Sequence, residues 1–105
     1  EVGAGTGGTA LPVLRLLQQR HPGCCAEYAF TDLGAHFVNA FARRYRHEFP
    51  FLRTRALDIG QHPSRQGFAA GEYDVVICVN VLHATPSVET TLAHVHSLLA
   101  AGGVL

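Results

Sequence analysis

The order in which short apolar runs alternate with helical periodicities constrains the fold of this chain more than any other feature of its sequence. We expect strands at residues 1–2, 27–31, 51–57, 73–79 and 104–105, with helices after the first, second and fourth of them. Strands that alternate with helices pair in parallel through right-handed crossovers. The sequence therefore predicts an α/β fold with a doubly wound, mostly parallel sheet, truncated to about five strands.

Each expected helix carries an apolar face at helical spacing. In chain order, the faces are formed by Leu11, Leu14 and Leu17, then by Phe37, Ala40, Phe41 and Tyr45, and finally by Val88, Leu92, Val95 and Leu99. We expect His21-Pro22-Gly23 to end the first helix, Thr85-Pro86 to open the last one and Gly102-Gly103 to end it. Residues 60–71 are expected to form a loop with room for one helical turn.

The clearest strand is expected at 73–79, where residues 75–79 are apolar on both faces. Such a strand is typical of the centre of a parallel sheet. Ligands bind doubly wound sheets at the carboxyl ends of the strands. The residues that follow each strand are therefore the candidates for function.

Composition excludes several classes of protein. A chain of 105 residues forms about one domain, and 48% hydrophobic with 15% charged residues excludes a disordered segment. A formal net charge of zero argues against binding to nucleic acid or to an acidic membrane, and no apolar run reaches the ~20 residues that span a bilayer. Three cysteines without a C-x-x-C pair encode neither a disulfide framework nor a zinc ribbon, which favours a reducing, cytoplasmic setting.

The two ends of the chain suggest an excerpt. The sequence contains no Met, begins with Glu1-Val2-Gly3 and stops at Val104-Leu105, directly after a glycine pair. We expect residues 1–105 to be cut from a longer multidomain polypeptide, inside a domain at both ends. The alternative is a processed protein with frayed ends.

A glycine-rich turn connects the first strand with the first helix. Gly3, Gly5 and Gly8 match the dinucleotide pattern G-x-G-x-x-G. Glu1, Gly3, Gly5 and Gly7 also match E-x-G-x-G-x-G, which places a carboxylate two residues before the first glycine. A carboxylate repels a pyrophosphate and suits a ligand that carries an ammonium or sulfonium group. A plain tight turn is the alternative.

Aspartates follow the second and third strands. Asp32 can accept two hydrogen bonds from vicinal ribose hydroxyls, or it can cap the second helix. Asp58 can accept a hydrogen bond from the exocyclic amine of an adenine, with Leu57 and Ile59 packed on the base. Alternatively, it can be a solvated loop residue.

Asn80 and His83 follow the fourth strand. Asn80 can bind a polar ligand tail, and His83 can act as a base near neutral pH, because the unperturbed pKa of histidine is roughly 6.5. The chain has seven histidines, so a structural role for His83 stays open. His94 and His96 do not share a helix face, and no metal site is expected.

Together these residues resemble the class I S-adenosylmethionine-dependent methyltransferases, and most closely the C-methyltransferase domains embedded in polyketide synthases. The likeness runs along the whole chain in the family's order. The glycine motif is generic to the superfamily, whereas the Asn-Val-Leu-His-Ala-Thr stretch is much more specific. The motifs that carry the likeness are residues 1–9, Phe30-Thr31-Asp32, Leu57-Asp58-Ile59, Gln66-Gly67-Phe68, Tyr73-Asp74-Val75-Val76, residues 80–85, and Leu98-Leu99 before the glycine pair.

The resemblance implies a Rossmann-like partial methyltransferase core over residues 1–105, with S-adenosylmethionine as its cofactor. It implies that Gly3, Gly5 and Gly7 face the methionine portion of the cofactor and that Glu1 lies near its amino group. The remaining cofactor contacts that it implies are Asp32 on the ribose, Asp58 on the adenine amine, Leu33 and Ile59 against the ring, and Asn80 lining the pocket.

His83 is the catalytic base that the resemblance implies. In the family this histidine is paired with a glutamate on the fifth strand, which would fall just past Leu105. The family's usual Lys-Pro before the glycine pair is replaced by Ala100-Ala101, a change in a loop.

The implied substrate is the α-carbon of a β-ketoacyl thioester on an acyl carrier protein, with neighbouring synthase domains in the same chain as partners. We expect the 105 residues alone to be inactive. The alternatives are an NAD(P)-binding Rossmann oxidoreductase, a vestigial methyltransferase module of a megasynthase, and a peptide N-methyltransferase. The methyltransferase hypothesis requires Gly5, Asp32, Asp58 and His83 to converge on one nucleoside-sized hollow.

Overall fold

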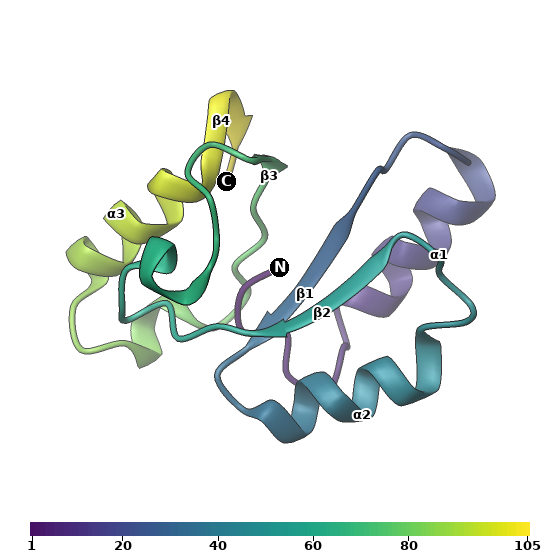
Figure 1. Cartoon of the computed structure of the whole chain (residues 1–105), viewed down its shortest axis with the longest axis horizontal. Helices are drawn as coiled ribbons and strands as arrows, with labels where there is room; N and C mark the ends of the chain where they lie inside the picture. The colour runs from purple at the N-terminus through teal and green to yellow at the C-terminus, as the bar shows by residue number, and fades with distance from the viewer. The chain divides into compact units, whose positions relative to one another are not determined.

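The computed structural model describes residues 1–105 and has the α/β character that the sequence predicts. The chain divides into two compact units (Figure 1). The first unit comprises Glu1 and Gly3–Ala56, and the second comprises Val2 and Leu57–Leu105. The helices and strands are α1 (Ala10–Arg20), β1 (Tyr28–Asp32), α2 (Ala35–Tyr45), β2 (Leu52–Ala56), η1 (Pro63–Gln66), β3 (Tyr73–Val75), η2 (Leu82–Ala84), α3 (Val88–Leu98) and β4 (Leu99–Val104).

In the first unit, β1 and β2 form a parallel pair with an unbroken register from Tyr28 opposite Leu52 to Asp32 opposite Ala56. The connection between them is α2, as expected for a parallel crossover. The glycine-rich turn precedes α1, and the helix ends at Arg20, directly before the predicted His21-Pro22-Gly23. The predicted bounds of these two strands are therefore confirmed to within one residue.

The core of the first unit is an aromatic stack between β1 and α2. The rings of Phe30 and Phe41 are stacked with centroids 4.1 Å apart, and Tyr45 continues the stack at 4.7 Å from Phe41. Phe30 and Phe49 are completely buried, and burial of each side chain contributes about 1.5–3 kcal/mol to folding. This stack holds α2 against the strand that ends at Asp32.

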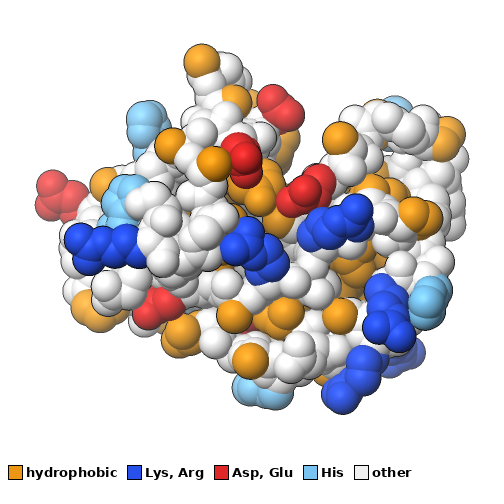
Figure 2. All heavy atoms as spheres, in the orientation of Figure 1, with side chains coloured by type: hydrophobic (Ala, Val, Ile, Leu, Met, Phe, Trp, Pro, Cys, Tyr) orange, Lys and Arg blue, Asp and Glu red, His pale blue; other side chains and the backbone are white.

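The opposite face of α2 is basic. Arg43, Arg44 and Arg46 are exposed, and Figure 2 shows arginine side chains over the C-terminal part of this helix. All eight basic side chains of the protein are arginines, and only Arg65 lies beyond residue 56. The positive charge of the chain is thus concentrated in the first unit.

In the second unit, β3 and β4 form a parallel pair, and α3 runs between η2 and β4. Val2 adds an isolated parallel bridge to Cys78, with its backbone N–H donating to the carbonyl of Ile77 at 2.9 Å. The buried core of this unit consists of Val2, Leu57, Ile59, Phe68, Val76, Val95 and Leu98. The helical turn expected within residues 60–71 is present as η1.

Two of the predicted strands are shorter in the structure than expected. The strand expected at 73–79 ends at Val75 and resumes only at the Cys78 bridge. Val75 and Val79 are 59% and 44% exposed, so apolar composition on both faces does not mean burial on both faces here. The first expected strand is likewise reduced to the Val2 bridge, and the strands form two two-stranded sheets.

The glycine pair does not end the last helix. The helix ends at Leu98, and Gly102 and Gly103 lie inside β4. A Cβ on Gly103 would lie 3.2 Å from the carbonyl oxygen of Asp74 on β3 and 2.9 Å from that of Ala100. Glycine is needed there because two backbone segments approach closely, not because a helix stops.

The buried face of α3 also differs from the predicted one. Thr91, Val95 and Leu98 are buried, whereas Val88 and Leu92 are exposed. Ser87 provides the N-cap, since its Oγ accepts the N–H of Thr90 at 3.2 Å. None of the helices is both long enough and apolar enough to cross a membrane.

Candidate functional site

Asp32 links the glycine-rich turn to the end of β1. Its Oδ2 accepts the backbone N–H of Gly5 at 2.8 Å, and its Oδ1 accepts the N–H of Gly34 at 2.8 Å. A carboxylate offers about four lone-pair positions, so each oxygen can accept a further hydrogen bond. The N-cap residue of α2 is Gly34, with no side-chain cap, so Asp32 joins two loops instead of capping the helix.

The glycines of the turn have distinct roles. Gly3, Gly5 and Gly7 have φ angles of +66°, +57° and +90°, which glycine adopts without strain. A Cβ on Gly5 would meet no atom within 4 Å, so this position borders open space where a ligand can approach the backbone. A Cβ on Gly7 would instead overlap the buried ring of Phe41. Gly7 is therefore required by the aromatic core.

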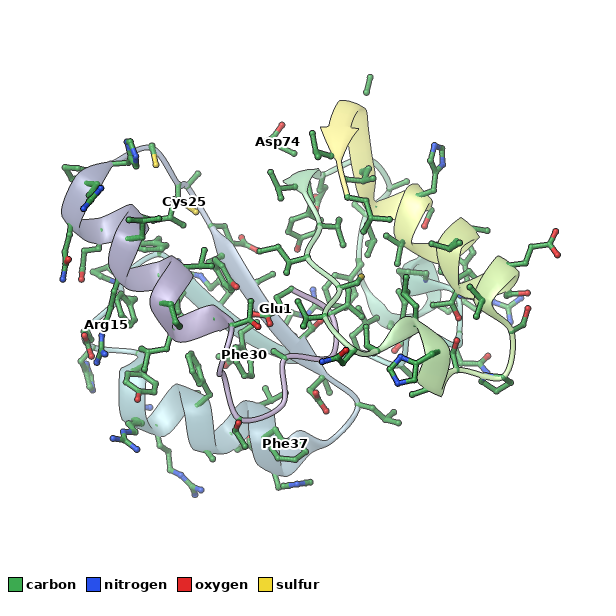
Figure 3. The ribbon with its side chains drawn as sticks, turned by 180° about the vertical axis from the view of Figure 1, so that it is seen from behind. Glu1, Arg15, Cys25, Phe30, Phe37 and Asp74 are labelled. Carbon is green, nitrogen blue, oxygen red and sulfur yellow. The ribbon has the colours of Figure 1, made fainter.

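Glu1 is fixed along β1 by its backbone and by its side chain (Figure 3). Its nitrogen donates to the carbonyl of Ala29 at 2.7 Å, and its carbonyl accepts the N–H of Thr31 at 3.0 Å. The hydroxyl of Tyr28 donates to Oε2 of Glu1 at 2.7 Å. Burial raises the pKa of the Glu1 carboxyl, and the hydrogen bond from Tyr28 opposes that rise.

Tyr28 was not among the predicted site residues. Burial, followed by its hydrogen bond to the Glu1 carboxylate, raises the pKa of the Tyr28 phenol. The phenol therefore stays protonated and remains a donor to Glu1 at all physiological pH values. Leu33, which follows Asp32 directly, is 71% exposed, so its side chain is accessible to a ligand ring.

In the second unit, the backbone of Asp58 is held by the side-chain amide of Gln66. Oε1 of Gln66 accepts the N–H of Asp58 at 2.9 Å, and Nε2 donates to the carbonyl of Asp58 at 2.8 Å. Oδ1 of Asp58 accepts the N–H of Gly60 at 2.9 Å. Asp58 is therefore an ordered, half-buried acceptor and not a freely solvated loop residue.

Ile59 lies within the core of the second unit and is 5% exposed, so little of its side chain is accessible to a ligand ring. Nδ1 of His94 lies 2.7 Å from the carbonyl oxygen of Ile59. That carbonyl can only accept, so Nδ1 carries the proton in this contact. His94 is thus a structural residue that connects α3 to the Asp58–Ile59 segment.

Asn80 has a φ of +54°, the only positive φ of a non-glycine residue in the chain. Asn tolerates this left-handed conformation better than most residues. Its side chain is exposed at the turn that follows Val79. The backbone thus gives one reason for Asn at this position, and the predicted ligand contact is a second.

His83 lies in the short helical turn η2 and is exposed. The turn is closed by Thr85, whose hydroxyl donates to the carbonyl of Leu82 at 2.7 Å. The hydroxyl of Thr91 on α3 in turn donates to Oγ1 of Thr85 at 2.8 Å. A pair of threonines therefore anchors the turn that presents His83, and neither was predicted as part of the site.

The structure brings Glu1, the glycine turn, Asp32 and Leu33 together in the first unit. Asp58, Ile59, Asn80 and His83 belong to the second unit. The convergence of both groups on one ligand stays a prediction. No cluster of three His, Cys, Asp or Glu side chains suited to a metal ion is present.

The family model described as a methyltransferase domain matches residues 1–105. The chain belongs to this methyltransferase family. The family prediction made from the sequence is therefore confirmed.

The chain is similar to polyketide synthase ThaQ of Burkholderia thailandensis, with 47% identity over 107 residues, which covers 100% of this chain and 5% of the relative. It is also similar to two solved structures, each covering 98% of this chain. One is the trans-methyltransferase CalH in complex with SAH, with a TM-score of 0.81, 41% identity and 29% of that chain covered. The other is the DszA carbon methyltransferase, with a TM-score of 0.88, 38% identity and 26% of that chain covered.

These neighbours confirm the class I methyltransferase fold that was predicted. The chain spans about a twentieth of the polyketide synthase relative and just over a quarter of the solved methyltransferases.

Proposed function

We propose that the protein that carries this chain transfers a methyl group from S-adenosylmethionine to the α-carbon of a β-ketoacyl thioester on an acyl carrier protein during polyketide synthesis. Membership of the methyltransferase family and similarity to a carbon methyltransferase support this reaction. The observation that carries the proposal is the hydrogen bond from Gly5 to Asp32. It places a carboxylate with spare acceptor capacity beside a backbone that a ligand can approach.

The residues present fit this cofactor. Each carboxylate oxygen of Asp32 accepts one hydrogen bond from a backbone N–H and can accept one more. The two vicinal hydroxyls of a ribose could donate these further hydrogen bonds. The carboxylate of Glu1 suits the ammonium group of the methionine portion. Exposed Leu33 suits an adenine face, and Asp58 suits the exocyclic amine.

The carboxylate of Glu1 disfavours the alternative of a nicotinamide-dependent oxidoreductase. In a dinucleotide complex the pyrophosphate lies at the glycine turn and the start of the following helix. Glu1 is held close to that turn by β1, and its charge would repel the phosphates. A direct comparison of binding of NADH and of S-adenosylhomocysteine separates the two hypotheses.

The side chains of this chain supply proton transfer and orientation. Bound S-adenosylmethionine supplies an electron-poor methyl group on a sulfonium. His83 would take the α-proton of the β-ketoacyl group, so that the carbon becomes nucleophilic. The exposed position of His83 on η2 leaves its ring accessible to a substrate. The resemblance implies that a glutamate outside residues 1–105 orients this ring and stabilises its cation.

The partners that we propose are an acyl carrier protein and neighbouring synthase domains in the same polypeptide. Similarity to polyketide synthase ThaQ supports this setting. We also propose a reducing, cytoplasmic location, because the sequence has three cysteines and no C-x-x-C pair. The intact glycine turn, Asp32 and His83 argue against a vestigial module, as degraded motifs would be expected there.

Binding of S-adenosylhomocysteine to an Asp32→Ala variant tests the cofactor assignment. We expect the Kd measured by calorimetry on the protein that carries this chain to rise about 5–150-fold, equivalent to about 1–3 kcal/mol, since a charge-assisted hydrogen bond is lost. Asp74→Ala, which removes an exposed carboxylate on β3, is the matched control and should bind normally. An unchanged Kd for the folded Asp32→Ala variant would remove Asp32 from the site.

The role of His83 is tested by a His83→Ala variant in a single-turnover mass assay of methyl transfer. We expect transfer to be lost and the Kd for S-adenosylhomocysteine to stay within about twofold of the wild type, because the base contacts the acceptor and not the cofactor. Retained transfer would exclude His83 as the base. Localisation of the new methyl group by NMR separates carbon from nitrogen methylation.

A further inference from the structure

We propose that Gln66 is a positioning residue that fixes Asp58 for recognition of adenine, and that it thereby sets the preference for adenine over hypoxanthine. This inference rests on the proposed function, in which Asp58 accepts the exocyclic amine of the cofactor. Gln66 lies eight residues beyond Asp58, at the end of η1.

The contact between these two residues is reciprocal. The side-chain amide of Gln66 accepts the N–H of Asp58 at 2.9 Å and donates to its carbonyl at 2.8 Å. In a β-sheet, a neighbouring strand provides these two hydrogen bonds: it accepts the backbone N–H of a residue and donates to its carbonyl. The side chain of Gln66 thus acts in place of a strand at a position where β2 has already ended at Ala56.

Two other hydrogen bonds of Asp58 restrict the orientation of its side chain further. The carbonyl of Asp58 also accepts the N–H of Gln61 at 3.1 Å, and Oδ1 accepts the N–H of Gly60 at 2.9 Å. With the backbone and Oδ1 fixed, Oδ2 has one defined direction. An acceptor aimed in one direction distinguishes an amine from a carbonyl at the same place on a ring.

The local sequence explains why Gln66 reaches back to Asp58. Pro63 opens η1 and is buried, and Gly67 ends it in the left-handed conformation with a φ of +85°. The N–H of Phe68 then donates to the carbonyl of Pro63 at 3.2 Å, and Phe68 enters the core. This closed turn holds Gln66 in a fixed place relative to Asp58.

Binding of two cofactor analogues to the protein that carries this chain tests the proposal. S-adenosylhomocysteine carries the exocyclic amine, and S-inosylhomocysteine carries a carbonyl in its place. We expect the wild type to bind the inosyl analogue about 10–100-fold more weakly, the scale of a hydrogen bond to a charged group. In Gln66→Ala, the ratio of the two Kd values should fall by at least about fivefold, because Asp58 loses its fixed direction.

The matched control is Gln61→Ala, which removes the same side chain from the same loop and leaves the backbone N–H that binds Asp58. Its Kd ratio should equal that of the wild type. Gln66→Glu keeps the acceptor for the N–H of Asp58 but replaces the donor to its carbonyl, so its ratio should also fall. If circular dichroism shows that Gln66→Ala does not fold, the Kd ratio of Gln66→Glu tests the positioning role of Gln66 instead.

Asp58→Ala separates failure of the inference from failure of the proposed function. If Asp58→Ala abolishes the preference and folded Gln66→Ala or Gln66→Glu retains it, the positioning role of Gln66 is overturned and the adenine contact of Asp58 stands. If Asp58→Ala leaves the preference unchanged, the adenine contact of Asp58 fails, and the inference about Gln66 fails with it.

Discussion

Two glycines of the same turn are needed for different physical reasons. Gly5 borders open space and donates its N–H to Asp32, whereas Gly7 lies against the ring of Phe41. The resemblance to methyltransferases implied that both glycines contact the cofactor. The sequence alone could not separate them, because the identity of the packing partner depends on how α2 lies on β1.

A Gly7→Ala variant should be destabilised by about 2–5 kcal/mol. The cost combines the left-handed φ of +90° with overlap between the new Cβ and Phe41. Gly8→Ala is the matched control, since a Cβ there meets nothing within 4 Å, and its stability should change by less than about 0.5 kcal/mol. Urea denaturation of both variants measures the difference, and equal midpoints would contradict the packing role of Gly7.

The chemistry-bearing residues at strand ends were predictable because residue type and position suffice to suggest them. Asp32 follows a clear strand, and the structure shows its carboxylate on the glycine turn. Gln66 and Tyr28 were not predicted as functional residues. Gln66 contacts Asp58, and Tyr28 contacts Glu1. These contacts depend on the tertiary structure, which the hydrophobic periodicity of the sequence does not predict.

At the scale of elements, α3 shows why a hydrophobic pattern can select the wrong face. The sequence favoured Val88 and Leu92, yet Thr91 is buried at 1% exposure. A threonine can occupy a core position when its hydroxyl has a partner, and Thr91 donates to Thr85. The helix is therefore oriented by a polar contact as well as by apolar burial.

A Thr91→Val variant tests that orientation. Valine preserves the shape but removes the hydroxyl that holds Thr85, which closes the turn carrying His83. We expect methyl transfer to slow by about tenfold, since small displacements of a catalytic group are costly, while the Kd for S-adenosylhomocysteine stays unchanged. Thr91→Ser keeps the hydroxyl and should restore the rate. A normal rate in Thr91→Val would show that the turn holds His83 without this contact.

At the scale of the whole molecule, the order of elements and the parallel pairing followed from the sequence, and the extent of the sheets did not. Strand length depends on a neighbour to pair with, and the run at 73–79 pairs regularly only as far as Val75. The presence of all three α-helices was predicted, since their hydrogen bonds are internal to each segment. The division into two compact units coincides with one difference in composition, since only Arg65 among the arginines lies in the second unit.

The buried contact between Tyr28 and Glu1 should make the stability of the protein sensitive to alkaline pH. The pKa of the folded Tyr28 is raised above its ordinary value of 10.0. The unfolded chain therefore loses this proton first, and folding stability falls as pH rises above 10.0. Tyr28→Phe cannot ionise, so its urea midpoint should fall less between pH 9 and 11 (roughly the range in which an unshifted tyrosine ionises).

Tyr45→Phe is the control, because it removes the phenol of another buried tyrosine of the first unit. Its urea midpoint should follow that of the wild type over the same pH range. If Tyr28→Phe and the wild type lose stability in parallel, the phenol of Tyr28 does not contribute to the alkaline loss.

The bond between Gly5 and Asp32 ties together two parts of the chain that the proposed cofactor would contact at different ends. Recognition of the sugar and recognition of the amino-acid tail are then thermodynamically coupled. Energetic effects of substitutions at these two positions should be non-additive in a double-mutant cycle. A substitution that adapts one end of such a pocket to a modified methyl donor would therefore also change the affinity of the other end.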